Sequence, residues 1–132
     1  MILDSSAVVA IALQEPGYQA LLDALGRDPR VGIGAPTLVE TAIVLTARLQ
    51  RDTRGLLSRF LLEGDVAVLP FTDAHFGTAM DAWLRFGRDR HPADLNFGDC
   101  LAYATAHLAG EPLLFTGQDF RRTDLPAALE PQ

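Results

Sequence analysis

Short apolar runs alternate along this chain with longer stretches of helical periodicity, and this alternation restricts the fold more than any other feature. The runs are three or four residues long and lie at residues 1–4, 31–34, 66–69 and 113–115. Such runs are typical of strands buried on both faces, and strands separated by helices favour a parallel sheet. We therefore predict one α/β domain over residues 1–132, in which helices cover both faces of a short parallel sheet.

The stretches between these runs predict helices. Residues 36–51 carry the clearest apolar stripe, formed by Leu38, Ala42, Leu45 and Leu49 at helical spacing. Further helices are expected at residues 5–13, 16–25, 52–63, 73–86 and 99–109. The helix at 73–86 has the stripe Phe76, Ala79, Met80 and Trp83.

The composition excludes several classes of protein. The chain is 48% hydrophobic and 21% charged, which suits a packed core, and no apolar stretch is long enough to span a membrane. The first residues lack the basic region and long apolar stretch of a signal peptide. Cys100 is the only cysteine, which excludes an internal disulfide and a cysteine-based zinc cluster. These features lead us to expect a cytoplasmic protein with no membrane partner.

Four acidic residues stand beside apolar segments, where a lone buried carboxylate is costly: Asp4, Glu40, Asp99 and Asp119. Asp4 ends the first predicted strand and Asp119 follows the last. Glu40 and Asp99 each lie in the first turns of a predicted helix. Right-handed crossovers place the carboxyl ends of the strands at one edge of the sheet, where open α/β sheets bind ligands. The four carboxylates can therefore converge.

Converged carboxylates repel one another unless a hard cation neutralises them. Oxygen ligands without cysteine or well-placed histidine suit Mg²⁺ or Mn²⁺ better than zinc, and such a site can support phosphoryl displacement. Each acid also has a simpler interpretation. Asp4 and Asp99 can cap helices, Glu40 can lie on a helix edge, and Asp119 can serve a turn. The residues alone leave both interpretations open.

The net charge of −6 argues at first against a nucleic-acid partner. If four of the 17 acidic residues hold cations, 13 remain against 11 basic residues, and the cations shift the balance further. All the basic residues are arginine, whose planar fork suits phosphate, although a GC-rich genome would also favour arginine.

Four motifs, in this order, resemble those of PIN-domain proteins. Residues 4–10, Asp-Ser-Ser-Ala-Val-Val-Ala, resemble the family's opening motif, and residues 36–40, Pro-Thr-Leu-Val-Glu, resemble its second acidic motif. Residues 96–104 and 114–120 resemble the third and fourth. Residues 87–93 resemble the VapC branch, the toxins of VapBC toxin–antitoxin pairs. The resemblance covers nearly the whole chain.

This resemblance implies a PIN-like three-layer sandwich and a ribonuclease that depends on Mg²⁺ or Mn²⁺. The enzyme would cleave RNA phosphodiesters by metal-activated water, as the toxin of a type II toxin–antitoxin system. The positions that match the family's acidic site are Asp4, Glu40, Asp99 and Asp119. Ser6 matches a residue that supports this site by hydrogen bonding. Gln118 departs from the asparagine expected there, which makes Asp119 the weakest match. A homodimer and a cognate VapB-like antitoxin are further implications.

Three arginines beside the third motif, Arg85, Arg88 and Arg90, are candidate contacts for RNA phosphates. A solvated polar loop is the alternative interpretation of the same residues. The stripe Leu56, Leu57, Phe60 and Leu61 is expected in the core, and the resemblance implies that it can also help form an antitoxin groove.

Two other functions remain as alternatives. A PIN-like module could bind RNA or a partner without cutting, although the retained acids argue against it. A phosphatase or phospho-acceptor would use Asp4. The haloacid-dehalogenase-like phosphatases and response-regulator receivers rely on a lysine near the phosphate, and this chain has no lysine.

Overall fold

The computed structural model describes residues 1–130 and contains, in that range, a four-stranded parallel sheet with the order β3-β2-β1-β4. The strands are β1 (Ile2–Leu3), β2 (Val31–Gly34), β3 (Val66–Leu69) and β4 (Leu113–Leu114). Strand β1 lies at the centre, with Ile2 opposite Gly32 on one side and Leu113 on the other. The four predicted strands are confirmed, and their parallel course brings their carboxyl ends to one edge.

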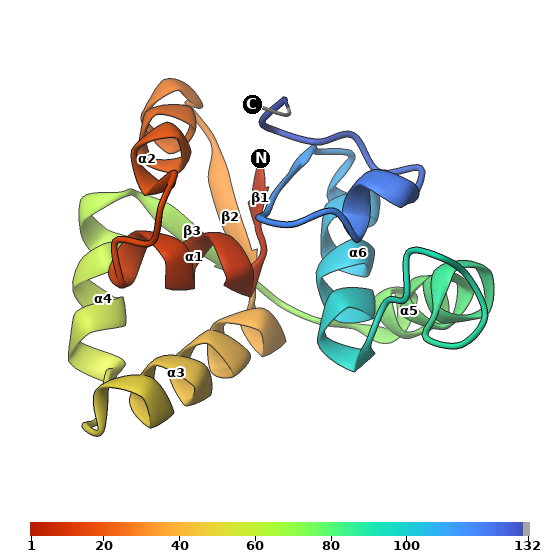
Figure 1. Cartoon of the computed structure of the whole chain (residues 1–132), viewed down its shortest axis with the longest axis horizontal. Coiled ribbons are helices and arrows are strands. Elements are labelled where there is room, and N and C mark those ends of the chain that lie inside the picture. Colours follow the sequence, from red (N-terminus) through yellow and green to blue (C-terminus); the bar gives the residue numbers. More distant parts are fainter. Residues whose placement is uncertain (131–132) are drawn as a thin grey trace.

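Helices cover both faces of the sheet, which confirms the predicted three-layer α/β sandwich. They are α1 (Ser5–Ala12), α2 (Tyr18–Arg27), α3 (Ala35–Leu49), α4 (Arg54–Glu63), α5 (Asp73–Phe86), α6 (Phe97–Ala109) and the 3₁₀ helix η1 (Phe120–Arg122). Figure 1 shows α1 to α4 on one side of the sheet and α5 with α6 on the other. None of the helices in residues 1–130 is long and apolar enough to cross a membrane.

The core has two parts, one on each face of the sheet. Successive strand residues point to opposite faces, so Leu3 packs under α1 to α4 while Ile2 packs under α5 and α6. The first part also contains Val8, Ile33, Leu45, Leu57 and Leu114. The second also contains Phe86, Leu95, Tyr103, Leu113 and Phe115. Strands β1, β2 and β4 are buried along their whole length, which explains why they are continuous apolar runs rather than alternating ones. The edge strand β3 is also apolar, although Ala67 and Val68 are exposed.

Helix α2 begins two residues later than the sequence predicts. Pro16 lies in the turn before it, and Gly17 precedes its first residue with φ of 91°, in the left-handed region that glycine adopts readily. A helix cannot continue through a left-handed residue, so the first turn starts at Tyr18.

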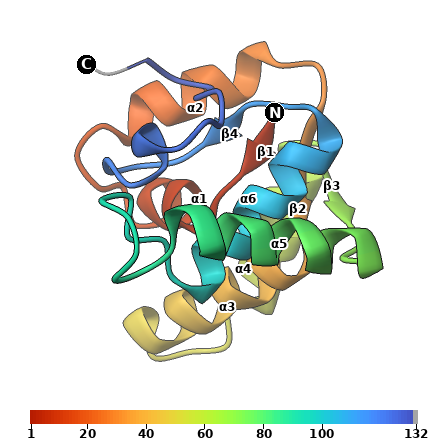
Figure 2. The ribbon, with the colours of Figure 1, turned by 90° about the vertical axis from the view of Figure 1, so that its right-hand side faces the viewer.

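The apolar stripe predicted for α5 lies largely on the outer side of the helix. Phe76 is 69% exposed, and Met80 and Trp83 are exposed as well, whereas Ala82 and Phe86 are the buried residues of this helix. Figure 2 shows α5 as the outer helix in front of α6. Ala82 and Phe86 pack with residues of α6, so the side chains of Phe76, Met80 and Trp83 face outward.

Candidate active site

Asp4 lies directly after β1 and caps α1. Its Oδ2 accepts hydrogen bonds from the Ser6 amide at 3.1 Å and from the Ser6 hydroxyl at 2.6 Å. Asp4 is only 4% exposed, and its Oδ1 is buried without a hydrogen-bond partner among residues 1–130. Asp4 Oδ2 therefore caps α1, as one interpretation predicted. Capping does not explain why Oδ1 is buried without a partner. An unpaired buried oxygen costs about 1–3 kcal/mol.

The electrostatics of Asp4 show that other acids lie near it. Burial raises the pKa of Asp4 from 3.8 to about 6, the hydrogen bonds from Ser6 oppose this rise, and the charges of Asp99 and Glu40 add to it. Figure 1 shows the first turns of α3 and α6 on the same lower side of the sheet as the end of β1. Three acids far apart in the sequence thus meet at this edge.

Glu40 reaches from α3 to the backbone of α6. A Cβ atom built on Gly98 would overlap the Glu40 carboxylate. The absence of a side chain at Gly98 therefore allows the carboxylate to lie against the first turn of α6, next to Asp99. Sequence reasoning did not single out Gly98 as functional, although its place directly before Asp99 was the available signal.

Asp99 belongs to a capping box at the start of α6. Its amide donates to Asn96 Oδ1 at 2.9 Å, and the Asn96 amide donates to Asp99 Oδ2 at 3.0 Å. Burial raises the pKa of Asp99, with further increases from the charges of Asp119 and Glu40 and opposing effects from Asn96 and Arg88. The capping box fixes the orientation of the Asp99 side chain, and in that orientation the charges of Glu40 and Asp119 still act on its carboxylate.

Asp119 is exposed on the segment that follows β4. That segment is attached to the first motif, because the Thr116 amide donates to the Ser6 hydroxyl oxygen at 3.1 Å. The same hydroxyl donates to Asp4, so Ser6 connects the first and fourth motifs. The effect of Asp119 on the pKa of Asp99 places these two acids near each other.

The four predicted acids are thus gathered at one edge, but they do not enclose a common point. Among residues 1–130, no three Asp, Glu, His or Cys side chains stand in an arrangement that could hold a metal ion without rearranging. The donor set nevertheless fits a hard cation, because every donor is a carboxylate oxygen and one of them, Asp4 Oδ1, is buried and unpaired.

Two of the candidate arginines are engaged away from the acids. Arg85 donates to Asp124 Oδ2 at 3.3 Å, and its guanidinium lies over the Phe86 ring. The Arg90 guanidinium lies 4.7 Å from the centre of the Trp83 ring. These contacts are within the chain, so both arginines have structural roles beside any role in RNA binding.

Arg88 is the candidate arginine that acts on the acidic edge. It lies 3.8 Å from Asp94 in an exposed ion pair, and its charge lowers the pKa of Asp99. An exposed pair of this kind contributes little to stability. Its guanidinium is therefore available to a phosphate.

Comparison with known proteins agrees with the fold. A family model of the PIN domain matches residues 1–125. Ribonuclease VapC36 of Mycobacterium tuberculosis is 44% identical over 126 residues, which cover 95% of this chain and 91% of that protein. Ribonuclease VapC of Mycolicibacterium smegmatis is 39% identical over 127 residues, covering 96% and 98%. The chain therefore belongs to the PIN-domain family and, within it, to the VapC ribonucleases, as the motifs predicted.

Solved structures share the fold at low sequence identity. The crystal structure of Mycobacterium tuberculosis VapC20, a Sarcin-Ricin loop cleaving toxin, has a TM-score of 0.78 and 19% identity, and the match covers 98% of both chains. VapBC2 from Rickettsia felis, bound to a DNA fragment from its promoter, has a TM-score of 0.72 and 16% identity, covering 96% of this chain and 94% of that one.

Proposed function

We propose that this protein is an endoribonuclease that depends on Mg²⁺ or Mn²⁺ and acts as the toxin of a type II toxin–antitoxin pair. Membership of the VapC ribonucleases supports the RNA substrate. The observation that most supports a bound cation is the state of Asp4: its carboxylate is buried, and its Oδ1 has no hydrogen-bond partner among residues 1–130. A cation would give that oxygen a partner and neutralise the surrounding acids.

The residues that would hold the cation, directly or through water, are Asp4, Glu40, Asp99 and Asp119. When bound, the cation would supply an activated water and stabilise the charge that develops on the phosphate. Ser6 orients Asp4 by holding its Oδ2, and Asn96 orients Asp99 by holding its Oδ2. This leaves one oxygen of each aspartate for the cation.

The RNA would be positioned by groups around the acidic edge. Arg88 can bind a phosphate without disrupting the core, because its pair with Asp94 is exposed. A phosphate held there would bring the backbone of the RNA toward Asp99, whose pKa Arg88 already affects. The water oxygen would then form a bond to phosphorus as the bond from phosphorus to one ester oxygen breaks. The water gives up a proton and the departing oxygen takes one up, so the RNA strand ends in a phosphate monoester on one side and a free hydroxyl on the other.

The decisive experiment compares RNA cleavage by the parent protein and Asp99→Asn, with Mg²⁺ or with EDTA. The asparagine retains an oxygen for the Asn96 amide, so the helix cap survives while the charge is lost. We expect the variant to lose activity by about 100-fold or more, as for loss of a charged group at a catalytic centre. Asp81→Asn, on the exposed surface of α5, is the matched control. Full cleavage by Asp99→Asn, or equal cleavage in EDTA, would contradict the proposal.

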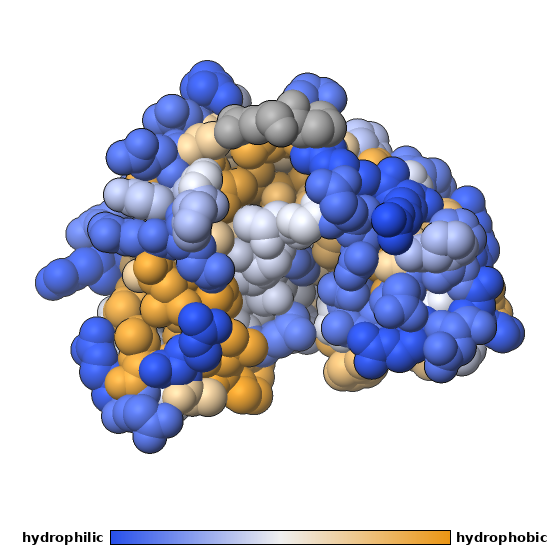
Figure 3. Space-filling view, viewed as in Figure 1, coloured by the Kyte–Doolittle hydropathy of each residue, from blue (hydrophilic) through white to orange (hydrophobic). Residues whose placement is uncertain are grey.

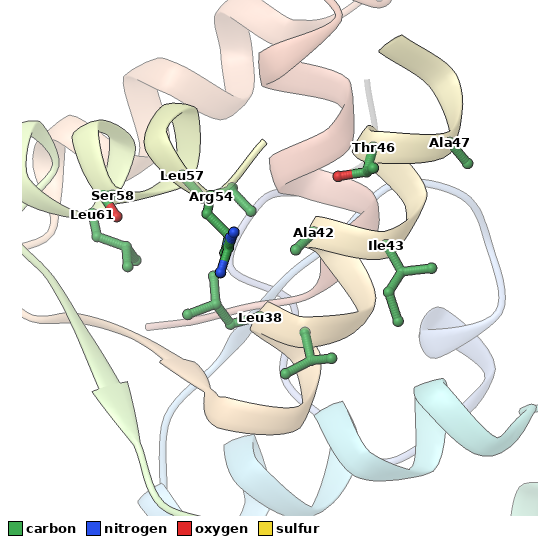
Figure 4. Close-up of a pocket in the computed structure, with 10 residues that line it drawn as sticks. Leu38, Ala42, Ile43, Thr46, Ala47, Arg54, Leu57, Ser58 and Leu61 are labelled. Atoms are coloured by element: carbon green, nitrogen blue, oxygen red, sulfur yellow. The ribbon is translucent and has the colours of Figure 1, made fainter. Parts of the chain in front are cut away.

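An exposed groove between α3 and α4 supports the proposed antitoxin partner. It has a volume of about 670 Å³ and is lined by Leu38, Val39, Ala42, Ile43, Thr46, Ala47, Arg54, Leu57, Ser58 and Leu61. Figure 3 shows a concentration of apolar surface over the region where Figure 1 places α3 and α4. In Figure 4, Arg54 extends from α4 toward Leu38. The Arg54 guanidinium is paired with Asp52 at 2.7 Å, so the apolar lining, rather than a free charge, decides what the groove accepts. The groove suits an apolar segment.

We propose that a VapB-like antitoxin inserts such a segment there. The α4 stripe packs on the core, as predicted, and its residues Leu57 and Leu61 also line this groove, which supports the proposed second role. The substitution Ser58→Trp would fill the groove and should abolish complex formation with the cognate VapB-like antitoxin. Arg59→Trp, one residue away and outside the groove lining, is the control. Unchanged binding by Ser58→Trp would refute this assignment.

The exposed apolar side chains of α3 and α6 beside Glu40 support the proposed homodimer. Phe97 is 78% exposed and Ile43 is 64% exposed, and both border a cavity of about 500 Å³ together with Val39. Contiguous apolar surface of this kind is typical of subunit contacts. Light scattering should show a dimer that Ile43→Asp dissociates and Leu62→Asp, on exposed α4, does not. A parent protein that is monomeric at high concentration would exclude the dimer.

A further inference from the structure

Three side chains, Arg85, Tyr103 and Asp124, tie the segment after η1 to α5 and α6; we call them the Tyr103 clasp. The Tyr103 hydroxyl donates to Asp124 Oδ1 at 2.8 Å, and Arg85 donates to Asp124 Oδ2 at 3.3 Å. Tyr103 is 1% exposed. Its ring stacks on His107 at 5.6 Å and approaches Phe86 at 6.0 Å. The packed ring gives the hydroxyl a fixed direction.

The clasp joins the two elements that carry Asp99 and Asp119. Tyr103 lies four residues after Asp99 on α6, which places the two side chains on the same face of the helix, one turn apart. Asp124 lies a few residues after Asp119 on the segment that follows β4. The bond from Tyr103 to Asp124 therefore links α6, which carries Asp99, directly to the segment that carries Asp119.

The chain between Asp119 and Asp124 is internally bonded. The Arg122 amide donates to the Asp119 carbonyl at 3.2 Å, within η1. The Thr123 hydroxyl then donates to the Phe120 carbonyl at 2.6 Å, and Phe120 itself is 3% exposed. A displacement at Asp124 is therefore transmitted to Asp119 rather than absorbed between them.

The other end of the same segment is held by the first motif. The Thr116 amide donates to the Ser6 hydroxyl oxygen at 3.1 Å, so the segment is attached before Asp119 as well as after it. After Asp119 it is held by the clasp, by the buried Phe120 ring and by the bond from Arg122 to the Pro92 carbonyl at 3.0 Å. Asp119 is exposed between them. Because its own side chain is not packed, its position depends on how the segment is held on either side, and the clasp ties this segment to α6, which carries Asp99.

We propose that Tyr103 is a positioning residue, which through Asp124 holds residues 116–124 so that Asp119 stays beside Asp99. This inference rests on the proposed cation site, because Asp119 matters to the reaction only as one of its acids. Tyr103 itself contacts neither the cation nor the RNA. If the clasp only stabilises the fold, its loss would lower the melting temperature without acting through Asp119.

The first test measures Mn²⁺ binding by calorimetry in the parent protein and Tyr103→Phe. The phenylalanine retains the ring contacts with His107 and Phe86 and removes only the hydroxyl. We expect the Kd for Mn²⁺ to rise about tenfold, at the lower end of the effect of losing a group that orients a metal ligand. Tyr18→Phe is the matched control, since the Tyr18 hydroxyl makes no hydrogen bond within residues 1–130. An unchanged Kd in folded Tyr103→Phe would overturn the inference.

A double-mutant cycle separates positioning from general stability. In an Asp119→Asn background, Tyr103→Phe should weaken Mn²⁺ binding no further, because its effect passes through Asp119. Additive losses would overturn the inference while leaving the cation site intact. If Asp119→Asn binds Mn²⁺ as the parent does, the assignment of Asp119 fails and the inference fails with it. If only Asp4→Asn and Asp99→Asn lose binding in that case, the proposed cation site still stands.

Hydrogen exchange gives a readout that needs no metal. Tyr103→Phe should speed exchange of the amides of residues 116–123 several-fold, with no change in α1 or α3. Asp124→Ala, at a half-exposed carboxyl, should reproduce this pattern and serves if Tyr103→Phe folds poorly. Uniformly faster exchange throughout the domain in both variants would show a structural role only and refute positioning.

Discussion

Replacing Asp4 by asparagine should stabilise the metal-free protein near neutral pH, although the same change should abolish activity. Asp4 is buried, and burial raises its pKa from 3.8 to about 6. The folded state therefore holds the proton more tightly than the unfolded chain does. Asparagine resembles the protonated side chain, because it is neutral and retains an oxygen for Ser6.

The sign of the pH dependence follows from this shift. Below the unfolded pKa, Asp4 is protonated in both states and has no electrostatic cost. As the pH rises from 3.8 toward 6, the unfolded state loses its proton first, so the folded state loses relative stability. Above the folded pKa the full penalty is present. A difference of about two pKa units corresponds to about 3 kcal/mol, an upper bound on what asparagine relieves.

Thermal unfolding in EDTA measures this difference directly. For a domain of this size, about 3 kcal/mol corresponds to a rise of about 10 °C in the melting temperature. We expect Asp4→Asn to melt up to that much higher than the parent at about pH 7.5, with the difference vanishing below about pH 4. Added Mg²⁺ should raise the melting temperature of the parent more than that of the variant.

The exposed Asp81 provides the control, because Asp81→Asn changes the same charge at the surface of α5. It should leave the melting temperature within about 1–2 °C of the parent, as surface substitutions usually do. A variant Asp4→Asn that melts at or below the parent temperature in EDTA near neutral pH would refute the reasoning. A difference in melting temperature between the variant and the parent that stays the same at every pH would refute it as well.

Three other changes test the geometry of the site. Gly98→Ala places a methyl group against the Glu40 carboxylate and should destabilise the protein by about 1–3 kcal/mol in thermal melts, an effect that Glu40→Ala in the same chain should relieve. Ser6→Ala removes the hydroxyl donor to Asp4, while the backbone amide still donates. The lost hydroxyl hydrogen bond lowers the pKa of Asp4, so the acidic limb of the pH–activity profile should move to higher pH; an unshifted limb would count against it. Arg88→Gln should weaken RNA binding and reduce its salt dependence in filter-binding assays, and an unchanged salt slope would exclude a phosphate contact.

The strands could be predicted because burial on both faces leaves a direct mark on the sequence. Each strand is a short run with almost no polar residues, and the ends of β2 and β3 match the prediction. The orientation of α5 could not be predicted in the same way. Periodicity identifies an apolar stripe such as that of Phe76 but does not say which neighbour covers it, and α6 covers the other side.

The acids were recognisable because each stands where an apolar segment ends. The sequence left open whether Asp4 and Asp99 cap helices or belong to a common site. In the structure each of them caps a helix, and the charge of Asp99 also affects the pKa of Asp4. Gly98 and the bond from Tyr103 to Asp124 were not predictable from spacing. Both depend on contacts between residues that are distant in sequence, which only the packed structure brings together.

The central claim, that the acids at this edge bind a divalent cation, is tested most directly by a crystal structure of the protein grown with Mn²⁺. We predict an anomalous difference peak within metal–ligand distance of carboxylate oxygens of Asp4 and Asp99, with Asp4 Oδ1 now paired, and no such peak in crystals of Asp4→Asn. A well-diffracting parent crystal with no peak at this edge, or with the peak retained in Asp4→Asn, would contradict the account.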